Sequence, residues 1–200
     1  MEIPDIITPT DLIVRWKSYT EPQQVTIFYQ DNPQYQNACF SNFYRHKPFT
    51  FTIPDECGPA SGDNVLIYFS EKAIMLCKAS LMGDMKTYQK IKYANTPRMA
   101  KILGRQVTNF NEDLWQNNIC RIAKAVITSK FTKVDGLKEV LLATGTTLIA
   151  EAAINDKIWG IGMDRKDPNY HYPDKWKGSN ILGWALMIVR NDLFLDDYSK

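Results

Sequence analysis

The sequence has few of the residues that mark secreted, membrane-spanning or metal-binding proteins. Its 200 residues include four cysteines, none in a Cys-x-x-Cys pair, and two histidines that stand far apart, His46 and His171. This usage favours reduced thiols in a cytoplasmic protein, and the histidine spacing offers no zinc site. The longest strongly apolar run, Ile181 to Val189, is far shorter than the roughly 20 residues that span a bilayer, so no membrane partner is expected. The first residues lack a basic region followed by an apolar one, so no signal peptide is expected.

Strong charge and the familiar catalytic motifs are also lacking. The formal net charge is +2, which is too small to indicate a nucleic-acid or membrane surface but leaves room for an anionic small molecule in a pocket. No Walker loop, nucleophile elbow or Ser/His/Asp signature is present. The Gly-x-Gly at Gly160 to Gly162 lacks the third glycine and the strand-to-helix setting of a dinucleotide site. These absences argue against the common nucleotide-hydrolysing and dinucleotide-dependent classes.

The chain combines short strand-like runs with longer helical repeats. β-branched and aromatic residues predict short strands or strand-like turns at 25–29, 40–44, 48–53, 65–69, 146–150 and 157–161. Capping residues and apolar spacing predict helices at 70–82, 96–104, 111 through 126, 135–143 and 181–191. Loops are expected at 54–64 and 164–179. Helices outnumber strands and are not regularly interleaved with them, which predicts an α+β fold, mainly helical with short strands and hairpins.

One domain is expected to occupy most of the chain. A chain of 200 residues can form one self-sufficient core, and no composition shift or linker marks an internal boundary. The bounds of this domain, residues 25–194, come from the span of the family resemblance given below. Residues 1–24 are interpreted as a loosely attached N-terminal lead-in, and residues 195–200 as a C-terminal tail.

One candidate site lies on the helix expected from Ser70, which can cap it. Glu71 and Lys78 stand seven residues apart, nearly two turns, so they share one stripe about 10 Å apart along the helix axis. The rest of the helix is largely apolar, and a carboxylate and an ammonium there need water or partners. Spacing alone favours two solvated charges at the helix edge over a buried functional pair.

A second candidate is the segment 151–162, with Asp156 at an Asn-Asp turn and Trp159 shortly after it. Its glycines let the backbone approach a ligand or adopt a positive φ. Pattern alone slightly favours a hairpin with Trp159 in the core. Asn42, in Ser-Asn-Phe-Tyr, either binds a polar ligand or forms a turn, and Trp115 on its helix is more often a core residue than a pocket residue.

These pieces match the motifs of a known family in order. Along the chain they are Phe40 to Tyr44, Pro48-Phe49, Ser70-Glu71 through Lys78, Leu103-Gly104-Arg105, Trp115, Lys130-Phe131, Thr144-Gly145, Glu151-Ala152, Asp156, Ile158 to Gly162, Asn180, Leu182-Gly183, Leu186-Met187 and Arg190. In this order the chain resembles the NADAR (YbiA-like) N-glycosidases over residues 25 to 194. Three stretches depart from the family pattern: Ile67-Tyr68-Phe69 replaces Trp-Pro-Ser, Lys72-Ala73-Ile74 replaces His-Tyr-Phe, and Met75-Leu76-Cys77 replaces Gln-Ala-Gln.

The resemblance implies a single-domain enzyme that hydrolyses the C–N bond between ribose and a base or amino-pyrimidine. Members of the family split ribosylated pyrimidine intermediates of riboflavin biosynthesis or remove ADP-ribose from guanine bases. The implied partners are small N-ribosyl or ADP-ribosyl molecules, with ADP-ribosylated nucleic acid as a further substrate, and no cofactor is implied. The altered helix after Glu71 leaves an alternative open, a non-catalytic module that binds ADP-ribose or a nucleotide.

The resemblance also places Glu71, Trp115, Asp156 and Trp159 around the site. Breaking a glycosidic C–N bond builds positive charge on the ribose, and a buried carboxylate can stabilise that charge or activate the attacking water. Glu71 is therefore the expected principal carboxylate. Asp156 is a second acid/base or a ribose-binding group, and one of the tryptophans stacks on the base.

Five residues complete the predicted site. Asn42 and Asn180 are expected to hold sugar or base edges, and Arg105, Lys78 and Lys130 are candidate phosphate partners. Lys78 has a second candidate role, because a desolvated lysine can attack the aldehyde of an opened ribose and form a Schiff base.

Overall fold

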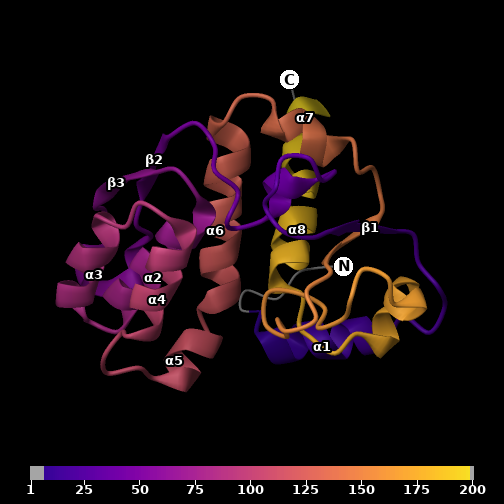
Figure 1. Cartoon of the computed structure of the whole chain (residues 1–200), viewed down its shortest axis with the longest axis horizontal. Helices are drawn as coiled ribbons and strands as arrows, with labels where there is room; N and C mark the ends of the chain where they lie inside the picture. The colour runs from indigo at the N-terminus through magenta and orange to yellow at the C-terminus, as the bar shows by residue number, and fades with distance from the viewer. Residues whose placement is uncertain (1–6, 199–200) are drawn as a thin grey trace.

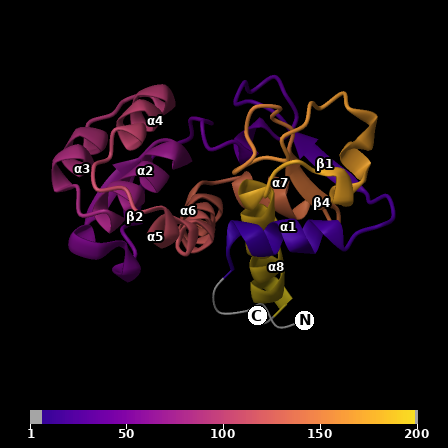
Figure 2. The same cartoon turned by 90° about the horizontal axis from the view of Figure 1, so that it is seen from below.

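A long helix, α6 (Ile119–Lys133), runs through the middle of the molecule, with a group of elements on either side (Figures 1 and 2). The computed structural model describes residues 7–198. One group contains α2 (Ser70–Leu81), α3 (Met85–Lys92), α4 (Pro97–Arg105) and the hairpin of β2 (Phe49–Thr52) with β3 (Asn64–Ile67). The other contains α1 (Pro9–Lys17), α7 (Leu137–Leu142), α8 (Ile181–Tyr198), β1 (Val25–Phe28) and β4 (Leu148–Glu151). Because α6 packs against both α2 and α8, the two groups share one hydrophobic core.

The described strands form two separate sheets of two strands each. β1 pairs in parallel with β4, with Val25 opposite Leu148 and Phe28 opposite Glu151. β2 and β3 pair antiparallel, and the alternating burial along β2 places Phe49 and Phe51 in the core. Helices dominate the remainder, including the short α5 (Glu112–Gln116) before α6. The predicted α+β fold, mainly helical with short strands, is confirmed.

The N-terminal segment is more firmly attached than the sequence suggested. Thr8 and Asp11 form a capping box, in which the Thr8 N–H donates to Asp11 Oδ2 at 2.8 Å, and Pro9 opens α1. Leu12 and Trp16, one turn apart, are buried in the core, and Trp16 Nε1 donates to the Ser179 carbonyl oxygen at 2.7 Å. The expectation of a loose lead-in is therefore wrong for this helix. The domain boundaries at 25 and 194 stay predictions, and positions 1–6 and 199–200 of the predicted lead-in and tail lie outside the described residues.

Two local predictions are wrong. Residues 157–161 form a turn and not a strand, because Asp156 Oδ1 accepts from the N–H groups of Ile158 and Trp159 at 3.1 and 2.8 Å. The hairpin expected there is therefore absent from the described chain. The predicted helix at 111–126 is two helices, α5 and α6, separated at 117–118. Residues 40–44, predicted as a strand or a turn, form the end of the 3₁₀ helix Ala38–Phe40 and the turn that follows it.

Two helices differ from the sequence predictions, α3 in its presence and α2 in its capping residue. α3 was not predicted, since its sequence is mostly polar; the Asp84 carboxylate caps it by accepting from the Thr87 N–H at 2.9 Å. α2 begins at Ser70 as expected, but Phe69 occupies the capping position and no side chain caps the helix. The first turn of α2 is instead held by its neighbours, and this brings Glu71 against a loop.

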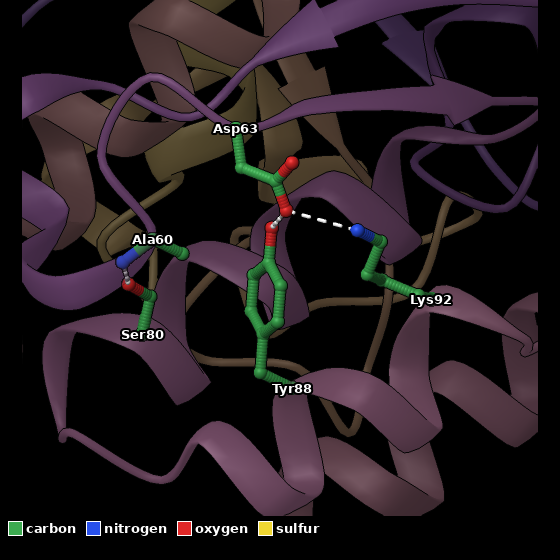
Figure 3. A network of polar contacts seen from close by, with 5 residues as sticks. All are labelled: Ala60, Asp63, Ser80, Tyr88 and Lys92. Carbon is green, nitrogen blue, oxygen red and sulfur yellow. Dashed lines mark hydrogen bonds and ion pairs between the residues drawn. The ribbon is translucent and has the colours of Figure 1, made fainter.

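Polar contacts fix the turn before β3 against the end of α2 and against α3 (Figure 3). The Ala60 N–H donates to Ser80 Oγ near the end of α2 at 2.9 Å. Asp63 Oδ2 accepts from the Tyr88 hydroxyl at 2.7 Å and pairs with Lys92 Nζ at 2.9 Å. The bond to Ser80 anchors the end of α2 that lies away from Glu71, and the Asp63 bonds hold α3 to the same turn.

α8 forms the centre of the other group. Residues 181–190 are all buried, and the helix continues to Tyr198, beyond the predicted end at 191. It packs against α6, α7 and β4. Among residues 7–198 no helix is long and apolar enough to cross a membrane.

Candidate functional site

A cleft lies where α2, α4 and α5 face the segment that follows β4. Its larger part, called here the aromatic lobe, has a volume of about 560 Å³ and is lined by Glu71, Met75, Lys78, Lys101, Gly104, Arg105, Trp115, Ile119, Ile154, Asn155, Asp156, Lys157, Ile158 and Trp159. A second part, the polar lobe, has a volume of about 400 Å³ and is lined by Tyr29, Gln30, Asp31, Ser41, Phe43, Lys101, Arg105, Glu151, Ala153, Ile154, Asn155 and Asp156. Two tryptophans, Trp115 and Trp159, thus line the aromatic lobe, and charged residues line both lobes.

A small cavity of about 30 Å³ lies where residues of the two lobes come together. Its lining residues are Ser41, Asn42, Phe43, Glu71, Lys101, Glu151, Asp156 and Trp159. This cavity, called here the junction cavity, is bordered by three carboxyl side chains and one ammonium. Such a set can transfer protons and stabilise developing charge.

Glu71 is held at the junction cavity by the start of α2. Its N–H donates to the Asn42 carbonyl oxygen at 2.9 Å, which ties the helix to the 41–44 loop. Its side chain is only 4% exposed, so the interpretation as a solvated charge at the helix edge is wrong. Burial raises the pKa of Glu71 to about 7, although the positive charge of Lys101 opposes the rise.

Lys78 borders the aromatic lobe two turns further along α2. Its Nζ donates to the Gly104 carbonyl oxygen at 3.0 Å and lies 4.4 Å from the centre of the Phe110 ring. Burial lowers the pKa of this half-buried ammonium from its ordinary value. Lys78 and Glu71 therefore face the same lobe, as their shared stripe predicted.

The two predicted tryptophans line the same lobe. Trp115 comes from α5 and is only 7% exposed, and Trp159 comes from the turn after β4 and is partly buried. Asp156 stands at the start of that turn and borders both lobes and the junction cavity. Its Oδ1 accepts from the N–H groups of Ile158 and Trp159, and these bonds fix the carboxyl group in place.

Asn42 and Arg105 approach the cleft from opposite elements. Asn42, on the 41–44 loop, is buried and borders the junction cavity, where its Oδ1 has no hydrogen-bond partner among the described residues. Arg105, at the end of α4, is exposed and borders both lobes. Its position suits an anionic group at the mouth of the cleft.

Lys130 and Asn180, two of the predicted substrate-binding residues, lie behind the cleft wall. Lys130 is fully buried and donates from Nζ to the Ser41 carbonyl oxygen at 3.0 Å, and burial lowers its pKa to about 7. Asn180 is also fully buried; its Nδ2 donates to the Ile149 carbonyl oxygen at 2.9 Å, and its Oδ1 accepts from the Glu151 N–H at 3.2 Å. The structure therefore places these residues as supports for the 41–44 loop and for the end of β4.

The site predicted from sequence omitted Glu151 and Lys101. Glu151 ends β4 and borders the polar lobe and the junction cavity; burial and the nearby Asp156 raise its pKa to about 8. Lys101 borders both lobes and the junction cavity. The position of Glu151 within an ordered motif was a usable signal, and Lys101 shares a helix face with Arg105, four residues on. Within residues 7–198 no group of three or more His, Cys, Asp or Glu residues is placed to hold a metal ion.

Comparison with known proteins matches most of the chain. The model of the NADAR domain matches residues 27–194. N-glycosidase R617 of Acanthamoeba polyphaga mimivirus is 37% identical over 133 residues, covering 66% of this chain and 78% of that protein. Riboflavin biosynthesis protein VVA0006 of Vibrio vulnificus is 26% identical over 86% of this chain, which spans 39% of that protein. The NMR structure of the Escherichia coli protein YbiA has the same fold, with a TM-score of 0.67, 22% identity and coverage of 91% of this chain and 92% of that one.

Proposed function

Because this chain belongs to the NADAR domain family, as its ordered motifs predicted, we propose that it is a hydrolase that cleaves the C–N bond between ribose and a base in a nucleotide-like or ADP-ribosylated substrate. Relatives named N-glycosidases support the reaction class. The observation that carries the proposal is the burial of Glu71 beside a lobe walled by two tryptophans. That arrangement suits a flat base and the ribose attached to it.

The proposed reaction depends on charge developing on the ribose. As the C–N bond lengthens, the ribose approaches an oxocarbenium ion, and a fixed carboxylate in a water-poor site stabilises that charge more strongly than water does. Glu71 is the carboxylate placed for this role. The base stacks on Trp115 or Trp159, and an aromatic ring is the natural partner for a flat heterocycle.

Asp156 and Asn42 complete the ribose site in this proposal. Both border the junction cavity next to Glu71, where the Asp156 carboxylate can accept a hydrogen bond from a ribose hydroxyl group and the Asn42 amide N–H can donate one. Asp156 also borders both lobes, so it can exchange a proton with the departing base. Lys130 and Asn180 act by holding the walls to which these groups are attached.

Lys78 is the candidate for a covalent step. Its burial favours the neutral amine, which can attack the aldehyde carbon of an opened ribose, lose water and form an imine. Borohydride adds hydride to that imine, so we expect it to attach the ribosyl fragment irreversibly to Lys78 when added during turnover. Intact-protein and peptide mass spectrometry would locate the adduct. Lys78→Met is the control and should give none; absence of any adduct on active wild-type protein would remove the covalent role.

A phosphate-bearing substrate is supported by the charge along α4. Residues 85–111 contain six Lys and Arg residues and no Asp or Glu, so the rest of the chain is net negative despite the overall +2. A hollow of about 380 Å³ on α4 is lined by Phe43, Arg98, Lys101, Ile102 and Arg105. It shares Lys101 and Arg105 with the cleft, so phosphates of ADP-ribose or of an ADP-ribosylated nucleic acid could follow it outward.

Arg98→Glu tests this phosphate path without touching the cleft. Arg98 lies in the first turn of α4, where a cation opposes the helix macrodipole, so Glu should keep or improve the stability of the helix. We expect KM for a phosphate-bearing substrate to rise about 10-fold with kcat unchanged, as loss of one charge-assisted contact predicts. Steady-state kinetics checks this, with Arg15→Glu on the distant α1 as the matched charge change. An equal KM in all three proteins would contradict the phosphate path.

The proposed function as a whole is tested by a substrate screen. Ribosylaminopyrimidines, ADP-ribosylated guanosine and NAD-like compounds are incubated with the protein, and released base is detected by mass spectrometry. Release of free base from at least one compound is the expected result. Tight binding of ADP-ribose by calorimetry without any release would instead favour the non-catalytic binding module.

A further inference from the structure

The junction cavity has room for a water molecule. Its volume of about 30 Å³ exceeds the roughly 10–15 Å³ that a bound water needs. It shares lining residues with both lobes, so a water bound there would lie beside a substrate in the cleft. A water held there would also need two or more polar partners, which the lining supplies.

Two residues that line this cavity each carry a buried oxygen without a donor among the described residues. The oxygens are Asn42 Oδ1 and Glu151 Oε2, and both atoms are shielded from solvent. A buried acceptor without a hydrogen bond is costly, so two on the lining residues of one cavity indicate a ligand with two donor hydrogens. Water has that chemistry, and the cavity has room for it.

The cavity also stands in the correct relation to the two lobes. Glu71 borders the cavity and the aromatic lobe, whereas Glu151 borders the cavity and the polar lobe. A base in the aromatic lobe would therefore leave on the side of Glu71. A water beside Glu151 would approach the ribose from the other side, as a displacement requires.

We propose that the junction cavity binds the water molecule that attacks the ribose, with its hydrogens on Asn42 Oδ1 and Glu151 Oε2, and that Glu151 is the base that takes its proton. This inference rests on the proposed glycosidase function and divides the work between the two glutamates. Glu71 stabilises the charge on the ribose, and Glu151 activates the nucleophile.

The proposed step balances with water as the only co-reactant. The water oxygen forms a bond to the anomeric carbon while one of its protons passes to the Glu151 carboxylate. The C–N bond breaks with its electron pair on the base nitrogen, which takes up a proton at the open side of the cleft. Glu151 returns its proton to solvent, so one water is consumed and free base and ribose are formed.

The charges around Glu151 suit a base. Burial and the negative charges of Asp156 and Glu71 make its carboxylate more basic, while Lys101 keeps the ionised form accessible. Asn180 sets its position, because Asn180 Oδ1 accepts a hydrogen bond from the Glu151 N–H at the end of β4. This gives the fully buried Asn180 a positioning role.

Azide rescue distinguishes the base from the charge-stabilising carboxylate. In Glu151→Ala we expect hydrolysis to fall by roughly 10²–10⁴-fold, the usual contribution of a general base. Azide is already an anion and needs no base, so it should restore base release at least 10-fold and yield a ribosyl azide, identified by mass spectrometry. Glu71→Ala is the matched control and should give neither rescue nor azide product, because azide cannot replace its role.

The outcomes separate this inference from the proposed function. A wild-type protein that releases base, together with Glu151→Ala that is equally active or is not rescued, overturns the water site and leaves the glycosidase intact. Rescue of Glu71→Ala in place of Glu151→Ala also overturns it and assigns the base to Glu71. A wild-type protein that releases no base from any substrate overturns the proposed function itself. Thermal unfolding of both variants and of Glu151→Gln shows that a lost rate is not a lost fold.

Discussion

Glu71→Gln should reduce the rate of base release by about 10²–10⁴-fold and at the same time stabilise the folded protein at pH 8. The lost rate follows from removal of the negative charge beside the ribose. The gained stability follows from removal of a charge that is only 4% exposed and that has no ion pair among the described residues. A catalytic residue is thus expected to weaken the fold that holds it.

The pH dependence of this effect follows from the pKa of Glu71. Burial raises it from 4.5 to about 7 in the folded protein. Between these values the folded state binds more protons than the unfolded state, so the free energy of unfolding of the wild type falls as pH rises. The buried carboxyl group costs no such stability below about pH 4.5, where it is protonated in both states, and the loss continues as pH rises through 7. Glu71→Gln should therefore match the wild type near pH 4 and exceed it by about 2–3 kcal/mol at pH 8. Wild-type turnover should rise with pH through about 7 to 8, as the carboxyl groups of Glu71 and Glu151 ionise.

Urea unfolding at pH 4 and pH 8, combined with turnover at pH 8, measures both effects. Glu112→Gln is the control, because Glu112 is an exposed glutamate in the first turn of α5. That variant should keep its turnover and show no comparable gain in stability. If Glu71→Gln retained most of its turnover, Glu71 would not be the principal carboxylate; equal stability at pH 8 would mean that water reaches its side chain.

Gly183→Ala should destabilise the protein by about 3 kcal/mol or more and abolish base release. Gly183 lies in the first turn of α8, where an added methyl group would overlap the Ile149 carbonyl oxygen and the Asn180 side-chain amide. The Ile149 carbonyl oxygen belongs to the backbone of β4, so the whole strand would have to move away from the helix. Asn180 would then release the Glu151 N–H, and the end of β4 would shift in the cleft.

Gly104→Ala is the matched control for this prediction. Gly104 also lies in a helix, but its added methyl group would meet the side chain of Met75, which can change rotamer. It should therefore cost less than Gly183→Ala. Thermal unfolding measures the difference, expected as a fall in Tm of roughly 10 °C for Gly183→Ala. A Tm within a few degrees of wild type would show that β4 and α8 are less tightly packed than their contact indicates.

Local chemistry along the chain predicted several elements well. Thr96 and Pro97 open α4, and the Asn111 side chain caps α5 by accepting the Leu114 N–H, as their residue types suggested. The shared stripe of Glu71 and Lys78 also predicted that both face one lobe. These features depend on residues within two helical turns, so the sequence carries them directly.

The burial of the site could not be predicted in the same way. Spacing favoured solvated charges, because the groups that cover Glu71 come from the 41–44 loop and from the segment after β4. The turn at Asp156 was missed because the alternation of 157–161 imitates a strand. Lys130 and Asn180 belong to the ordered motifs, yet their partners are backbone carbonyl groups far away in the sequence, at Ser41 and Ile149. A motif shows that a residue belongs to the family pattern, but it does not show whether the side chain lines the cleft or supports the cleft wall from behind.

The parallel pairing of β1 with β4 has a consequence for synthesis on the ribosome. Val25 cannot pair with Leu148 until β4 has been synthesised. The Glu151 N–H then finds its acceptor, the Asn180 side chain, only when residue 180 has emerged. The helices that carry Glu71 and Lys78 can form early from local contacts, but the opposite wall of the cleft assembles only after α8 has begun to leave the exit tunnel. A nascent chain arrested before residue 180 should therefore be largely helical and still unable to turn over substrate.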